Sequence, residues 1–232
     1  ILKKQIKKSL YKKLLIVFVF GLIQAFVGWW MVKSGLTENP YVSPYRLTFH
    51  LTNAIIIYCL LFWTCIEYYH LKRMRFLYFK INQSWILVSI IFVFITILSG
   101  GFMAGSNAGQ SFNTFPLMNG EIIPDDIYLE ELGIFNLFEN TVTINFNHRW
   151  IATLTFIYTF SLFTYLIFNK FIRLSNQIIF FVLIILSLQF MLGILTLLSN
   201  VQIQYGSLHQ TNSVVLLSTL LFVYYKSKIK GV

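Results

Sequence analysis

The chain has 232 residues, of which 57% are hydrophobic, 18% aromatic and only 11% charged. A soluble domain of this length cannot hide so much apolar surface, so the composition excludes that class and indicates a membrane-embedded protein. The net charge of +10 does not indicate nucleic-acid binding. The basic residues form short clusters between apolar runs, which is typical of segments facing the cytoplasm or matrix.

Six apolar segments are long enough to cross a bilayer as helices, for which about 20 residues are needed. They span roughly 14–32, 48–69, 84–104, 150–169, 176–199 and 208–225. Helices are expected because the backbone groups of a spanning segment must bond to one another. We therefore predict an all-α membrane protein with six transmembrane helices.

The links between these segments alternate in charge. The N-terminal stretch, the links after the second and fourth segments, and the tail are basic; the link at 33–47 is nearly balanced, 200–207 is uncharged and 105–147 is acidic. Because positive charge stays on the inner side of a membrane, this pattern predicts that both ends lie inside and the long 105–147 loop outside. A loop of that length indicates a lid or a docking surface.

Three of the four histidines, His50, His148 and His209, then mark the outer ends of their segments. Neutral imidazole is a common axial ligand of haem iron, so two such residues on neighbouring helices predict a haem site. The alternative is an interfacial histidine that reaches water. Zinc is disfavoured because no further cysteine, histidine or carboxylate lies at this level. His70, at the opposite end of its segment, is interpreted as a loop residue.

Arginines accompany two of these histidines. Arg149 follows His148, and Arg46 precedes His50 by about one helical turn. Either guanidinium is suited to a haem propionate or to a lipid headgroup, and the sequence leaves both interpretations open. The small residues of 100–109 leave room for a porphyrin or for close helix packing.

A weak internal repeat supports the histidine pattern. Gln24-x-x-x-Gly28 recurs as Gln189-x-x-x-Gly193, and each copy is followed by an outer link and a histidine-bearing helix. The repeat favours two related bundles: residues 1–82 as the last two helices of a first four-helix bundle, and 83–232 as a complete second one. The chain begins with a basic stretch and without Met, so we expect its natural N-terminus, and a partner for His50, to lie upstream.

Several motifs together resemble haem A synthase of the mitochondrial and proteobacterial type. They run in order along the chain: Gly28-Trp29-Trp30 through Leu36, Val42-Ser43-Pro44-Tyr45-Arg46-Leu47 with His50, Ala104-Gly105-x-x-Ala108-Gly109, Phe115-Pro116-x-Met118, Phe138-Glu139-Asn140, Asn147-His148-Arg149 and Leu208-His209-Gln210. No single motif is specific, but the combination covers essentially the whole chain.

The resemblance implies an enzyme that oxidises a methyl group of haem O to a formyl group by successive hydroxylations, giving haem A for terminal oxidases. It implies that His148 and His209 are the axial ligands of a haem b, and that His50 serves the substrate site. We assign Arg149 and Gln189 to the haem b site. The family's N-terminal Glu-x-x-His has Asn145-x-x-His148 as its counterpart here, so this position lacks a carboxylate, which fits a cofactor site. The catalytic carboxylate is then expected outside this chain, and we predict that this chain alone is inactive.

The implied surroundings are a bacterial inner membrane or, alternatively, a mitochondrial inner membrane. Partners implied are membrane lipid, haem O synthase, an electron donor such as a ferredoxin and a possible second copy; no nucleic acid is expected. Two alternatives remain: a di-haem b-type electron carrier, and a non-enzymatic transporter or assembly factor. Haem O synthase itself is disfavoured because it needs aspartate-rich magnesium sites, and the chain has only Asp125 and Asp126.

Overall fold

The computed structural model describes residues 8–35, 40–73, 83–168 and 176–228. The chain divides into two compact units, Ile1–Arg75 (unit 1) and Phe76–Val232 (unit 2), which are treated separately here. Our predicted boundary at residue 82 lies at the edge of 74–82, outside the described residues.

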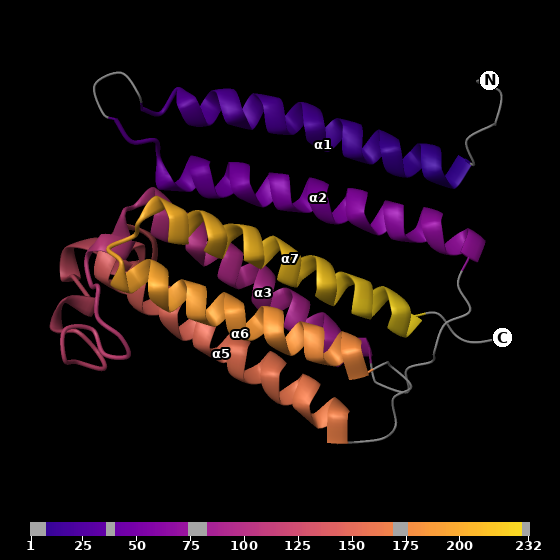
Figure 1. The fold of residues 1–232 in the computed structure, drawn as a ribbon. Coiled ribbons are helices and arrows are strands. Elements are labelled where there is room, and N and C mark those ends of the chain that lie inside the picture. The colour runs from indigo at the N-terminus through magenta and orange to yellow at the C-terminus, as the bar shows by residue number, and fades with distance from the viewer. Residues whose placement is uncertain (1–7, 36–39, 74–82, 169–175, 229–232) are drawn as a thin grey trace. The chain divides into compact units, whose positions relative to one another are not determined.

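Every long element in the described ranges is an α-helix (Figure 1). The helices are α1 (Lys8–Val32), α2 (Pro44–Arg73), α3 (Gln83–Gly105), α4 (Asn136–Glu139), α5 (Thr141–Phe168), α6 (Asn176–Leu198) and α7 (Ile203–Lys228). Five of these, α1, α2, α3, α5 and α6, are long and apolar enough to cross a membrane. This confirms an all-helical, multi-pass membrane protein. α7 is as long but less apolar, because residues 209–213 of its first half are all polar.

Several helices extend beyond the apolar segments expected from the sequence, and two of these extensions matter for the site residues and histidines. α5 begins at Thr141 rather than at 150, because the Asn140 side chain accepts a hydrogen bond from the Val142 amide (2.9 Å) and caps a polar first turn. A hydropathy profile does not detect a helical turn that contains polar residues, so the expected segment began later. α2 continues to Arg73, so His70 belongs to a helix and the loop interpretation was wrong.

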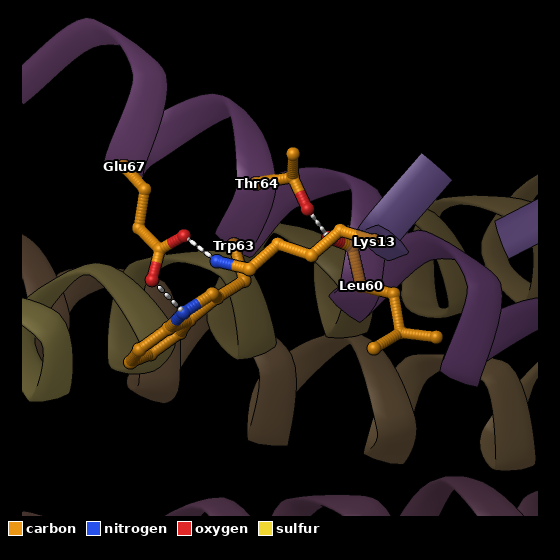
Figure 2. Close-up of polar contacts among 5 residues, drawn as sticks. All are labelled: Lys13, Leu60, Trp63, Thr64 and Glu67. Carbon is orange, nitrogen blue, oxygen red and sulfur yellow. Dashed lines mark hydrogen bonds and ion pairs between the residues drawn. The ribbon is translucent and has the colours of Figure 1, made fainter. Parts of the chain in front are cut away.

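Unit 1 is an antiparallel pair of helices, α1 and α2 (Figure 1). Near one end of the pair, Arg46 donates to the Trp30 carbonyl (2.8 Å). Near the other end, Lys13 forms an ion pair with Glu67, whose second oxygen accepts from Trp63 Nε1 at 2.9 Å (Figure 2). Most side chains of α1 are exposed and apolar, as expected for a helix that faces lipid or further helices.

Unit 2 is built from four long helices. α3 packs against α5 and α7, and α6 packs against the same two helices, so the four form a closed ring (Figure 1). Its core contains large side chains that are almost fully inaccessible: Ile86, Phe163, Ile179, Val182, Leu216, Leu217, Leu220 and Val223. Burial of these aliphatic and aromatic groups holds the helices at fixed positions, and therefore also the polar side chains on their inward faces.

The link between α3 and α5 is an ordered loop with short helical turns at Ala108–Gln110, Asp125–Ile127 and Glu130–Phe135. Asparagine side chains organise it. Asn113 donates to the carbonyls of Gly109 (3.1 Å) and Leu197 (2.8 Å), which ties the loop to the end of α6. Asn140 donates to the Asp126 carbonyl (2.9 Å). These bonds satisfy backbone groups that have no helix or sheet partner.

Candidate functional site

His148 lies on α5 inside the unit 2 bundle, against α3. Its Nδ1 is 2.8 Å from Ser99 Oγ, and the Ser99 hydroxyl also lies 2.8 Å from the Thr96 carbonyl oxygen. A carbonyl only accepts, so the single serine proton goes to Thr96 and Ser99 must accept from His148 Nδ1–H. The remaining nitrogen, Nε2, then carries the lone pair. This is the tautomer in which an imidazole ligates iron through Nε2.

His209 lies on α7 of the same bundle, close enough to His148 for the two imidazoles to interact electrostatically. The amide nitrogen of Gln189, on α6, lies 3.2 Å from His209 Nδ1 and 3.4 Å from Nε2. Asn212 Nδ2 in turn donates to Gln189 Oε1 (2.8 Å). The structure therefore brings together three of the predicted site residues, His148, His209 and Gln189.

Glycines allow these rings to lie against the neighbouring helices. A methyl group at Gly193 would sit 2.9 Å from His209 Cε1, closer than real contacts allow, and one at Gly100 would reach 3.4 Å from His148 Cε1. The small-residue stretch on α3 and the Gln-x-x-x-Gly repeat on α6 thus share one effect, close approach between a helix backbone and an imidazole.

Arg149 is occupied by the protein itself. Its guanidinium donates to Asn145 Oδ1 (2.6 Å) and to the carbonyls of Thr114 (2.8 Å) and Phe112 (2.7 Å). Asn145, fully buried, also donates to the Ala108 carbonyl (2.7 Å). A carboxylate could not make that donation, so an amide suits this position. Arg149 anchors the loop between α3 and α5, a role that the sequence did not indicate.

His50 lies in unit 1, on α2, and has surroundings of the same kind. Gln24 Nε2 is 3.0 Å from His50 Nε2, and Asn53 Nδ2 donates to Gln24 Oε1 (2.7 Å). A methyl group at Gly28 would lie 3.0 Å from His50 Cε1. His50 Nδ1 is buried and has no hydrogen-bond partner in the described part of the chain. Arg46 stacks over the Trp30 ring at 4.5 Å.

Ser99, Asn53 and Asn212 were missed by the sequence analysis. Ser99 carries no signal beyond its place in a small-residue stretch. The asparagines do carry one: His50-Leu-Thr-Asn53 matches His209-Gln-Thr-Asn212, so the repeat continues past each histidine as His-x-Thr-Asn. One helical turn separates the two residues, which places them on one face.

The side chains present are of the kind that could hold a haem. His148 and His209 lie on two helices of one bundle and could each offer a nitrogen ligand, and the Ser99 contact leaves the His148 Nε2 lone pair available. Within the described ranges, no three His, Cys, Asp or Glu side chains gather to hold a metal ion directly. The fold and site thus define a multi-pass membrane protein with a histidine pair inside a helical bundle.

Comparison with known proteins agrees with this class. A family model described as "cytochrome oxidase assembly protein" matches residues 1–221. A "heme A synthase" of Wolbachia pipientis from Culex pipiens is 39% identical over 224 residues, which are 95% of this chain and 65% of that protein. One from Nitrosomonas eutropha is 37% identical, with 95% and 63% covered. A "heme A synthase COX15" of Arabidopsis thaliana is 39% identical, with 89% and 48% covered.

The chain therefore belongs to the cytochrome oxidase assembly protein family. It spans just under two thirds of the length of the Wolbachia and Nitrosomonas relatives. No solved structure matches the chain.

Proposed function

We propose that this chain is part of a haem A synthase, which converts the methyl group of haem O to a formyl group by successive hydroxylations. The proposal rests on the name shared by the relatives and on one observation above all: Ser99 holds His148 with its Nε2 lone pair available inside a bundle that also carries His209. The membrane would be a bacterial inner membrane or, as the alternative, a mitochondrial one.

In this proposal His148 and His209 hold a haem b in unit 2, and His50 serves the haem O site of unit 1. When bound, the haem supplies the redox chemistry, while the protein supplies orientation and electrostatics. Ser99 fixes the His148 tautomer, and Gly100 and Gly193 let the rings approach the backbones of α3 and α6 closely. Arg149 holds the loop against the outer ends of the helices, which limits the access of water.

The proposed reaction needs partners that this chain does not supply. Haem O synthase would deliver the substrate, and an electron donor such as a ferredoxin would supply reducing equivalents.

Substitution of the two proposed ligands tests the proposal. In the full-length protein, His148→Met and His209→Met should each abolish or strongly shift the reduced-minus-oxidised spectrum of a low-spin b-type haem, because methionine changes the axial ligand field. His50→Met is the matched control and should leave that haem unchanged. An unchanged spectrum in both unit 2 variants would contradict the ligand assignment.

Pigment extraction separates the function from its alternatives. Haem O or haem A in the extract of the wild-type protein supports a synthase. Haem b as the sole pigment would support the di-haem electron carrier instead. A protein that carries and binds no haem would favour the transporter or assembly factor.

A further inference from the structure

Both units contain the same four-residue cluster between two antiparallel helices. In each, a glutamine on the first helix is followed one turn later by a glycine, and a histidine on the second helix is followed one turn later by an asparagine. The members are Gln24, Gly28, His50 and Asn53 in unit 1, and Gln189, Gly193, His209 and Asn212 in unit 2.

The hydrogen bonds in unit 2 have a fixed direction. Asn212 Nδ2 lies 3.1 Å from the Ile185 carbonyl oxygen and 2.8 Å from Gln189 Oε1. The backbone carbonyl can only accept, so the asparagine nitrogen faces both groups and donates to each. Gln189 therefore presents its own nitrogen to the ring, at 3.2 Å from His209 Nδ1. An amide nitrogen cannot accept, so the imidazole must.

Unit 1 repeats this arrangement. Asn53 Nδ2 donates to the Phe20 carbonyl (3.2 Å) and to Gln24 Oε1 (2.7 Å), and Gln24 Nε2 faces His50 Nε2 at 3.0 Å. Each ring that accepts from an amide N–H must be neutral, with one nitrogen unprotonated. His148 differs, since its partner Ser99 accepts and leaves the lone pair free.

A neutral imidazole has only one in-plane lone pair, because its other nitrogen carries a proton. Iron ligation uses that lone pair. The glutamine N–H and an iron atom are therefore mutually exclusive partners of the same ring, whichever nitrogen is involved.

We propose that Asn53–Gln24 and Asn212–Gln189 are amide relays that cap the lone pairs of His50 and His209 until haem displaces the glutamine. The proposal rests on the haem function proposed above. It makes the glutamines positioning residues of the haem-free protein. In the single ligand pair of unit 2, His148 is then the open member and His209 the capped one.

The cap is tested without haem by ¹⁵N NMR of the haem-free, full-length protein labelled at histidine. Gln189→Leu should change the His209 nitrogen resonances and leave those of His50 unchanged, while Gln24→Leu should do the reverse. Thr219→Val is the matched control, because Thr219 bonds only its own helix at the Val215 carbonyl in the described contacts; it should change neither ring. Unchanged His209 resonances in Gln189→Leu would overturn the relay.

Haem titration tests the displacement. Removing a competitor worth one net hydrogen bond should tighten haem binding by about two- to tenfold in Gln189→Leu. Weaker binding, with Thr219→Val unaffected, would overturn the cap and show that Gln189 supports the ligated ring. If the wild-type protein binds no haem but its NMR shows both caps, the proposed function fails and the relays stand. If haem binds and the resonances do not respond, the relays alone fail.

Discussion

At the scale of single residues, the three histidines differ in the hydrogen-bond partner of their imidazole ring. Ser99 accepts from His148, whereas Gln189 and Gln24 donate to His209 and His50. Similar imidazoles on similar helices are therefore left in different hydrogen-bonding states. Removal of contacts of this kind commonly changes metal affinity by about 10- to 100-fold. Under the proposed haem function, Ser99 and the amide side chains should therefore affect haem binding measurably.

The glycine beside His209 gives a residue-scale prediction. In Gly193→Ala the new methyl group would lie 2.9 Å from His209 Cε1, so the ring must shift, at a cost of about 1–3 kcal/mol for overpacking. The free energy of unfolding in detergent should fall by that amount, and the spectrum of the bound haem should shift.

Gly206→Ala, on the same helix as His209, is the control. Its methyl group would make only an ordinary 3.9 Å contact with Thr196, so the better helix propensity of alanine should leave stability equal or up to about 1 kcal/mol higher. Equal losses in the two variants would show that the Gly193 contact is not the cause.

At the scale of elements, Arg149 of α5 is one of the side chains that hold the loop between α3 and α5. Arg149→Lys keeps the charge but cannot reproduce the forked bonds to the Thr114 and Phe112 carbonyls. Loss of about 1.4 kcal/mol of local stability corresponds to about tenfold faster amide exchange. Hydrogen exchange should therefore rise at 112–118. Arg46→Lys, which perturbs unit 1, should leave that segment protected; equal protection in Arg149→Lys would refute the anchor.

The ion pair between α1 and α2 should contribute little to the free energy of unfolding. Lys13 and Glu67 keep 38% and 33% of their side-chain surface exposed, and such pairs are worth about 0–1 kcal/mol. A double-mutant cycle with Lys13→Gln and Glu67→Gln should give a coupling energy in this range. A coupling of several kcal/mol would show that the pair acts as a buried one. Lys12→Gln, at an exposed neighbour, should change stability by less than about 0.5 kcal/mol.

At the scale of the whole molecule, the charge pattern predicts which side of the membrane each segment faces. In a background where Cys59 and Cys65 are replaced by serine, Glu121→Cys should react with a membrane-impermeant maleimide in intact cells. Lys12→Cys should react only after lysis. Both positions are exposed in the structure, so accessibility to solvent does not explain a difference. Labelling of Lys12→Cys in intact cells would contradict the predicted topology and indicate the opposite orientation.

The sequence by itself determined the class of the protein and its candidate histidines. Apolar segments of spanning length can only be helices in a bilayer, and this physical constraint acts on each segment separately. That constraint does not fix the start of α5 or the end of α2, because polar residues there lower the hydropathy while the helix continues. The repeat continues in the sequence as His-x-Thr-Asn. The role of its asparagines became clear only from the structure, in which Asn53 and Asn212 each donate a hydrogen bond to a glutamine.

Only the tertiary structure decided the hydrogen-bond partners. Ser99 meets His148, and Gln189 meets His209, across residues separated by 49 and 20 positions. Arg149 was interpreted as a partner of a propionate or a headgroup, yet it bonds to loop carbonyls that no pattern places beside it. Spacing along a helix fixes which face a side chain occupies, but the packing of helices in three dimensions determines what that face meets, and hence which imidazole lone pairs are free and which are capped.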